Sequence, residues 1–469
     1  MMESIKSIWE ITDLRKRIGF TLILMAVYRL GSFIPTPGIN TAVFEQFANQ
    51  MGGTLFGLLS MFSGGSLNRL TVFALGIMPY ITAQIILQLL AVVSPTLEKL
   101  QKEGELGRRK ITDYTRWMTV GLAAFQALGI AIALERETVQ GNLPMVRDPG
   151  IGFIFTTVLT LTAGAVFIMW LGEQITSRGI GNGMSLLIFA GIVVGLPGAI
   201  GNLYGKVFVT RTWGPLTLLL LLLFMLAITA FIVFFERGER RIPIQYAKRI
   251  VGRRMMGGVS THLPLKVNSG GVMAIIFAIS LLTFPQTIGL FWKGGLFGKF
   301  VQDFLALFNW GEPLYTLTYV VLIIFFSHFY LSIIYNPDEV ADNVRKQGGF
   351  IPGIRPGKRT ADYVDDVLTK ITWVAGIYLS LVALIPEVML AGVRVNHLPV
   401  WLGGAWFDAH LPTWFLNGLG VHFYFGGASL LIVVGVAMDT VQQVEAQLIM
   451  RHYEGFLKKG RVRGRRAAS

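Results

Sequence analysis

Long apolar runs alternate with polar segments along almost the whole chain. A helix needs about 20 predominantly apolar residues to cross a bilayer, and ten of these runs approach or reach that length. They predict ten transmembrane helices, at residues 18–33, 72–93, 117–134, 151–171, 184–200, 215–235, 270–288, 314–335, 371–391 and 425–441. The pattern is typical of an all-α polytopic membrane protein.

One stretch departs from this regular alternation. Residues 55–62 form a short apolar run, and at about 1.5 Å per residue a helix of that length cannot span a bilayer. The run at 72–93 is long enough, but Gly76 and Pro79 interrupt it. A half-helix, a glycine break and a proline-containing span are typical of a segment that lines a cavity inside a membrane protein. A re-entrant loop without a pore would have the same pattern.

The N-terminal residues predict an amphipathic helix that lies on the membrane surface, over residues 1–17. Apolar side chains recur there at helical spacing, and Arg15, Lys16 and Arg17 follow at the membrane edge. A cleaved signal peptide is the alternative, but the apolar run that follows contains no small-residue cleavage site. Beyond it we predict an N-terminal half at 18–200, a C-terminal half at 214–441 and a basic tail at 442–469.

Charge sets the predicted orientation. The chain carries 41 Lys and Arg against 27 Asp and Glu, and its basic residues lie between the apolar runs. With ten spans, about 32 of those 41 cations fall on one side, which favours a topology with both termini in the cytoplasm. Five spans are an odd number of crossings, so the second set of five enters the membrane from the opposite side. The two halves can therefore be inverted copies.

The predicted membrane interior holds almost no ionisable side chain. His328 lies deep within a span, where a lone histidine is more often a packing residue than a proton carrier. Ion-coupled transporters usually need buried carboxylates or histidine relays, so a secondary transporter is the weaker alternative. No catalytic arrangement is evident within the spans, and the absence of cysteine excludes thiol chemistry. The other ionisable residues lie near span ends: Arg29, Glu173, Glu236, Glu387 and Asp439.

Two long polar segments, 236–268 and 336–370, have the features of docking surfaces for partners. The first predicts a projecting β-hairpin. The second presents Arg355 on a backbone that glycines and prolines constrain. Orientation charge alone is the alternative, but arginines held on such backbones suit phosphate-rich or acidic partners. The basic residues of the hairpin are Arg240, Arg241, Lys248, Arg249, Arg253 and Arg254.

Several blocks of sequence together resemble the bacterial SecY family, in order and over nearly the whole chain. They include SFIPTPGI, FSGGSLNRLTVFALGIMPYITAQIILQLL, WLGEQITSRGIGNGMSLLIFAGIV, GGFIPGIRPGKRT and FYFGGASLLIVVGVAMD. The resemblance implies a multi-pass channel of the bacterial plasma membrane, with two inverted five-helix halves around an hourglass pore. It implies that the channel conducts unfolded secretory proteins and releases transmembrane segments sideways into lipid, without a cofactor or chemistry of its own.

The resemblance also assigns roles to residues. A plug helix would comprise Leu55, Phe56, Gly57, Leu58, Leu59, Ser60, Met61, Phe62, Ser63 and Gly64. The pore ring would comprise Ile77, Ile81, Met184, Ile188, Ile276 and Ile432, in which Met184 replaces the branched aliphatic residue that we expect. The lateral gate would include Thr82, Gln88 and Phe284. A Trp-, Gly- and Pro-rich segment at 393–422 departs from the short outer turn usual in the family, and its role is not evident.

The same resemblance implies a set of partners. Energy for transport would come from the SecA ATPase or from a translating ribosome. SecE and SecG would be small membrane subunits beside the channel, and its cargo would be signal peptides and nascent or secretory polypeptides.

Overall fold

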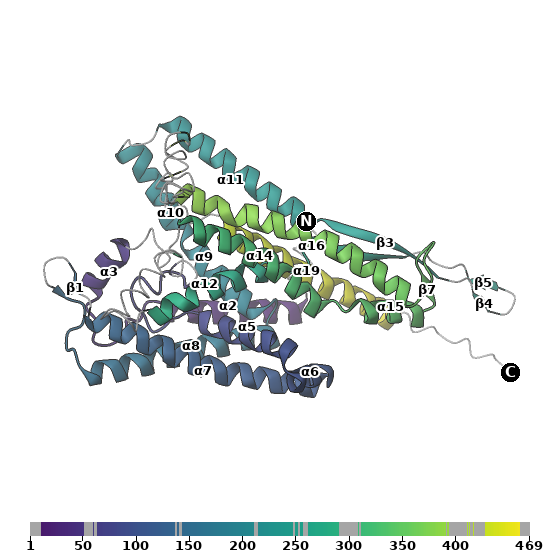
Figure 1. Ribbon diagram of the computed structural model, residues 1–469, viewed down its shortest axis with the longest axis horizontal. Coiled ribbons are helices and arrows are strands. Elements are labelled where there is room, and N and C mark those ends of the chain that lie inside the picture. Colours follow the sequence, from purple (N-terminus) through teal and green to yellow (C-terminus); the bar gives the residue numbers. More distant parts are fainter. Residues whose placement is uncertain are drawn as a thin grey trace.

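The computed structural model describes residues 11–50, 60, 63–136, 138–139, 143–210, 214–246, 249–251, 254–256, 261–289, 308, 311–390, 392–393, 410, 412, 416 and 427–459. Long helices run along the long axis of the molecule, with a strand hairpin at one end and α3 with β1 at the other (Figure 1). We call these the hairpin end and the α3 end.

The described part is dominated by helices. They are α2 Thr12–Gly31, α3 Thr41–Gln50, α5 Met78–Val93, α6 Pro95–Lys102, α7 Glu105–Arg136, α8 Ile151–Arg178, α9 Gly183–Val194, α10 Leu196–Tyr204, the π-helix η1 Gly205–Val209, α11 Pro215–Glu236, α12 Met273–Gly289, α14 Pro313–Ile334, α15 Pro337–Lys346, α16 Lys358–Leu390 and α19 Gly427–Lys459. The strands are β1 Thr138–Val139, β2 Leu143–Pro144, β3 Glu239–Tyr246, β4 Arg249–Val251, β5 Arg254–Met256, β6 Thr261–Lys266 and β7 Gly349–Phe350.

Each of the ten predicted spans coincides with apolar helix. Among the described residues, six helices are long and apolar enough to cross a membrane: α7, α8, α11, α14, α16 and α19. Helix α5 joins α6 at a bend of 106°, and the pair adds a seventh candidate. Helix α2 matches the first predicted span, α9 with α10 the fifth, and the shorter apolar helix α12 the seventh.

Several boundaries differ from the prediction, for local reasons. Residues 12–17, predicted on the membrane surface, form the first turns of α2. Helix α5 begins at Met78 instead of residue 72, because Gly76 adopts a φ of +57° and Pro79 suits a first helical turn. Gly195 separates α9 from α10. The polar segment 98–116 is mostly helical, since its Lys, Glu and Arg residues favour helix.

The largest cluster of buried side chains lies where the two halves of the chain meet. Helix α12 of the second half packs against α5 and α7 of the first, and α19 packs against α9. Ile81, Ile188, Ile276 and Leu431 all belong to this one cluster. The interface between the halves is therefore the apolar centre of the molecule.

The strands at the hairpin end confirm the predicted β-hairpin. Strand β3 pairs antiparallel with β6, with Ile242 opposite Leu263. Strand β7 pairs with the far end of β3, with Tyr246 opposite Gly349. Ile242 and Ile244 are buried while the residues between and before them are exposed, which is the alternation of a half-buried strand. The two polar segments thus form one three-stranded sheet, a link that the sequence did not predict.

Candidate functional site: an apolar constriction and the root of the plug

The six residues of the predicted ring come from four helices that the fold brings to one place. Ile77 caps the start of α5, and Ile81 lies one turn further along. Met184 and Ile188 lie on α9, Ile276 on α12 and Ile432 on α19. The five isoleucines are at most 6% exposed, and Met184 packs against the cluster that contains them. Both halves of the chain contribute to this contact.

The centre of that contact is a small apolar cavity of about 10 Å³. Such a volume holds about one water molecule at most, and no polar side chain lines it. Ile77, Ile81, Ile188 and Ile276 line the cavity as the ring predicts, whereas Met184 and Ile432 pack in the same core without lining it. Sequence reasoning missed the remaining two lining residues, Met78 and Ile279.

The position of α9 is fixed by close contact with α8. The Asn182 side chain caps α9 by accepting a hydrogen bond from the Met184 N–H at 3.1 Å. The Gly183 N–H donates to Thr176 Oγ1 at 2.9 Å. A Cβ at Gly183 would lie 1.9 Å from the Gly172 carbonyl oxygen, so glycine is required for this approach. These contacts set the height of Met184 and Ile188 relative to the constriction.

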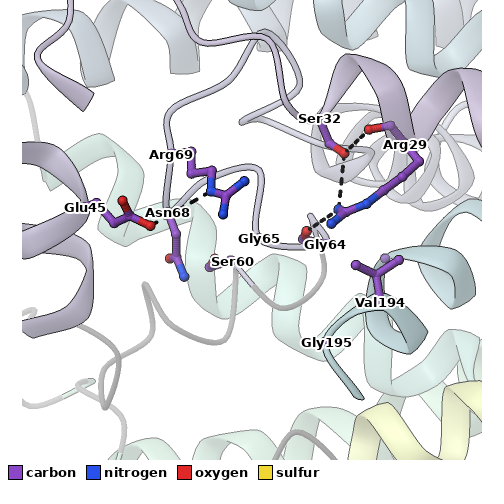
Figure 2. A pocket seen from close by; sticks show the side chains of 11 residues that line it. Arg29, Ser32, Glu45, Ser60, Gly64, Gly65, Asn68, Arg69, Val194 and Gly195 are labelled. Carbon is purple, nitrogen blue, oxygen red and sulfur yellow. Dashed lines mark hydrogen bonds and ion pairs between the residues drawn. The ribbon is translucent and has the colours of Figure 1, made fainter. Parts of the chain in front are cut away.

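The C-terminal part of the predicted plug is described at Ser60, Ser63 and Gly64, which we call the plug root; its other residues lie outside the described part. The Tyr28 hydroxyl donates to the Ser63 carbonyl at 3.3 Å. Arg29 Nη1 donates to the Gly64 carbonyl at 3.2 Å (Figure 2). Ser63 Oγ donates to the Ser60 carbonyl at 3.0 Å. The root is therefore bonded to α2 and to itself.

A pocket of about 210 Å³ adjoins the plug root at the α3 end. Arg29 and Arg69 both point into it, from α2 and from the loop that follows the root (Figure 2). Arg69 lies 3.9 Å from the Glu45 carboxylate, and the two guanidinium groups lie over the Phe33 ring at 4.4 and 5.5 Å. Ser60 Oγ is buried there and has no hydrogen-bond partner among the described residues.

The predicted lateral gate lies on α5 and α12, which contact each other directly. Thr82 is 8% exposed, and its hydroxyl donates to the Met78 carbonyl within α5. Gln88 Oε1 is buried without a partner among the described residues. Phe284 belongs to α12, but its side chain lies outside the described part. The seam between the halves is closed at the described residues.

The predicted docking residues lie at the hairpin end. Arg240 and Arg241 are exposed on β3, and Arg241 Nε donates to Glu239 at 2.7 Å. Arg249 and Arg254 belong to β4 and β5 with undescribed side chains, and Lys248 and Arg253 lie outside the described residues. Arg355 is exposed in a turn fixed by Gly353, with a φ of +83°, and by the Thr360 hydroxyl, which donates to the Arg355 carbonyl at 3.0 Å.

The His328 side chain and the search for a metal site bear on the chemistry predicted within the spans. His328 Nδ1 lies 3.0 Å from the Ile324 carbonyl oxygen, and its ring packs on Trp373 with centroids 4.9 Å apart. These contacts fit the packing role expected for a lone histidine within a span. Within the described ranges, no three His, Cys, Asp or Glu residues are placed to hold a metal ion.

The fold and the constriction define a class: a polytopic helical membrane protein whose two halves close on an apolar centre, as in a gated channel. A family model described as SecY matches residues 71–441. The chain is 47% identical over 455 residues to the protein translocase subunit SecY of Escherichia coli strain K12, and the match covers 96% of both chains. The chain belongs to the SecY family.

Solved structures agree with this at the level of the fold. A structure described as that of a protein conducting channel has a TM-score of 0.59 and 16% identity, over 92% of this chain and 91% of that one. Sec61 in the canine ribosome–channel complex from the endoplasmic reticulum has a TM-score of 0.53 and 15% identity. That match also covers 92% of this chain and 91% of the other. The chain is a channel protein of the translocase family and not an enzyme.

Proposed function

We propose that this chain forms the channel of a Sec translocase, which conducts unfolded polypeptides across the bacterial plasma membrane and releases transmembrane segments sideways into lipid. The observation that carries the proposal is the apolar constriction between the two halves, lined by Ile77, Ile81, Ile188 and Ile276. The lateral exit would be the seam between α5 and α12, where helices of the two halves meet without a covalent link.

The constriction suits both sealing and transport. A ring of aliphatic side chains offers an ion no polar partner, so ions and water are excluded while the ring is closed. The same side chains form no directional hydrogen bonds with a passing chain, so polypeptides of varied sequence can slide through. The plug, residues 55–64, would be a second barrier beside the ring, and its root would hold it there.

Charge supports one orientation in the membrane. The basic segments gather at the hairpin end, with Arg240, Arg241 and Arg355 exposed there. Because cytoplasmic loops carry an excess of Lys and Arg, we place the hairpin end and both termini in the cytoplasm. The α3 end, with the pocket beside the plug root, would then face the outside.

The exposed arginines at the hairpin end also suit the proposed partners. The sheet of β6, β3 and β7 holds its exposed arginines on fixed backbone, which favours acidic or phosphate-rich surfaces. We propose that the SecA ATPase and the ribosome dock there in alternation, and that SecE and SecG accompany the chain in the membrane. The ribosome-bound Sec61 complex among the related folds supports this choice of partner.

Reconstitution tests the proposed function. The purified chain, with SecE and SecG in lipid vesicles, should protect a signal-bearing unfolded precursor from added protease when SecA and ATP are present. Protection should require ATP and the signal sequence. Vesicles that protect no precursor, although the three subunits are correctly inserted, would overturn the proposal.

A single charge reversal tests the docking surface in the same assay. Arg355→Glu should abolish SecA-driven protection of the precursor, because a close interfacial charge pair contributes about 2 kcal/mol or more when it is desolvated. Lys358→Glu, which reverses another exposed cation a few residues along, is the matched control and should reduce protection much less. Equal transport by Arg355→Glu and the parent would show that Arg355 lies outside the contact.

A further inference from the structure

The pocket of about 210 Å³ at the α3 end carries an excess of positive charge. Of the residues that line it, Arg29 and Arg69 are cationic and Glu45 alone is anionic. Arg29 lies on the last turn of α2 and has no carboxylate partner among the described residues. Arg69 lies 3.9 Å from the Glu45 carboxylate, which is longer than a hydrogen bond, and both side chains are about half exposed. Within the described part of the chain, one positive charge of the pocket therefore has no counter-charge.

Both guanidinium groups also keep unused hydrogen-bond donors. A guanidinium carries five N–H donors in one plane. In Arg29, the hydrogen bonds to described residues all come from Nη1, which donates to the Gly64 carbonyl at 3.2 Å and to Ser32 Oγ at 3.3 Å. Both arginines point into the pocket, so N–H donors that no described residue accepts converge on its space (Figure 2).

The Phe33 ring brings the two like charges together. The central carbon of each guanidinium lies over this one ring, 4.4 Å from the ring centroid for Arg29 and 5.5 Å for Arg69. The two cations therefore lie close enough to repel each other. Contact with an aromatic face stabilises each cation but does not neutralise it. An anion between the two groups would remove the repulsion and accept hydrogen bonds from both.

Two neutral side chains of the same pocket are also unpaired. Ser60 is 2% exposed, and its buried Oγ has no hydrogen-bond partner among the described residues. Asn68 Oδ1 is buried without a partner there too, and an amide can turn either its oxygen or its NH2 group toward a ligand. Buried polar atoms are nearly always hydrogen-bonded, so an unpaired hydroxyl beside two guanidinium groups indicates a polar ligand.

We propose that this pocket binds a small oxyanion of the phosphate class, held between the Arg29 and Arg69 guanidinium groups with Ser60 Oγ as a further donor. The planar fork of a guanidinium matches the spacing of phosphate oxygens, so two of them can grip one phosphate group. The volume leaves room for the ion and several water molecules. Glu45 competes with the ion for Arg69. The site does not depend on the proposed function, because it can be measured without any transported chain.

Two probes separate the sources of such a phosphate group. The full-length chain is purified in a neutral detergent without phospholipid, and binding is measured by titration calorimetry at constant ionic strength in chloride. Inorganic phosphate represents a free anion, and glycerophosphoglycerol, a soluble diester, represents a lipid headgroup. Tighter binding of phosphate would assign the site to a free anion, and tighter binding of the diester would assign it to a headgroup. A chain that binds neither probe would overturn the proposal.

The two arginines should both be required. Arg29→Gln and Arg69→Gln should each weaken binding of the preferred probe about tenfold or more, because a hydrogen bond from a charged donor shifts an equilibrium by that order. Arg147→Gln removes an exposed cation at the same end of the molecule but outside the pocket, so it is the matched control and should bind like the parent. Parental affinity in both pocket variants, or an equal loss in all three, would show that the probe binds elsewhere.

Glu45→Gln separates a binding site from a general loss of fold. It removes the carboxylate that competes for Arg69, so the probe should bind about two- to fivefold more tightly, the range expected for an exposed ion pair. Damage to the fold would weaken binding and could not produce this gain. An affinity that is unchanged or lower in Glu45→Gln would contradict the site.

Discussion

Two neighbouring glycines at the plug root have different surroundings. Gly64 has a φ of +66°, and a Cβ there would come within 2.9 Å of the Gly191 Cα. Gly65 has a φ of +79°, but a Cβ would meet nothing within 4 Å. Both positions favour glycine on conformational grounds, while only Gly64 also needs it for packing.

Alanine at each position separates these two requirements. The left-handed conformation costs about 1–2 kcal/mol for an alanine at either site. Gly64→Ala should in addition push the root away from the α9 backbone, so its resting ion conductance in vesicles should exceed that of Gly65→Ala several-fold. Equal conductance of the two variants would mean that the contact with Gly191 does not hold the plug.

At the level of single residues, the sequence predicted four of the six side chains that line the cavity and missed the other two. The i, i+4 spacing of Ile77 with Ile81 indicated one shared helix face, and both line the cavity. Ile279 follows Ile276 by three residues and could have been found by the same rule. Met184 and Ile432 line the core but not the cavity, because lining depends on how α9 and α19 are rotated against α5. No local pattern determines that rotation.

At the level of elements, the most consequential unpredicted feature is the sheet that joins the two polar segments. Strand β7 adds to β3, and the Tyr246 hydroxyl donates to Gln347 Oε1 at 3.3 Å. Buried Ile242, Ile351 and Val364 pack this sheet onto the end of the helix bundle. Arg240 and Arg355 therefore belong to segments that one sheet joins, although more than a hundred residues separate them in the sequence.

A common surface predicts a common electrostatic effect. Arg240→Glu combined with Arg355→Glu should weaken the binding of SecA and of ribosomes, and the loss should be largest at low ionic strength. Arg147→Glu, a single charge reversal at the α3 end, should leave binding unaffected. Binding is measured by co-sedimentation with nanodiscs across a salt series. A salt dependence identical to that of the parent would show that these arginines only set orientation.

Helix identity was predictable and helix ends were not. Hydropathy alone located the apolar segments, since a bilayer requires continuous backbone hydrogen bonding over a known thickness. It could not find the helices beyond the apolar runs, such as the first turns of α7 or the last turns of α19. Those ends follow from propensity and from contacts such as the Arg116–Glu173 ion pair at 2.8 Å between α7 and α8.

At the level of the whole molecule, the two halves meet along two seams. Helix α12 closes on α5 and α7 along one seam, and α19 on α9 along the other. Between them lies the apolar centre, so separation at the first seam would open both the pore and a path to lipid. Charge and span count could predict two halves from the sequence. The register between them depends on contacts between helices far apart in the sequence, such as α19 with α9, which no local pattern encodes.

The central claim is that the apolar constriction seals the closed channel. Ile188→Asn combined with Ile276→Asn places amides from both halves in the cavity, which supplies hydrogen-bonding groups and admits water. Leu379→Asn is the control for a buried amide, because Leu379 is 0% exposed in the same core without lining the cavity. The decisive measurement is ion conductance of vesicles that contain the channel and no translocating chain. The account predicts that the double variant conducts several-fold more than the parent and than Leu379→Asn. A double variant that is correctly inserted and conducts no more than the parent would contradict it.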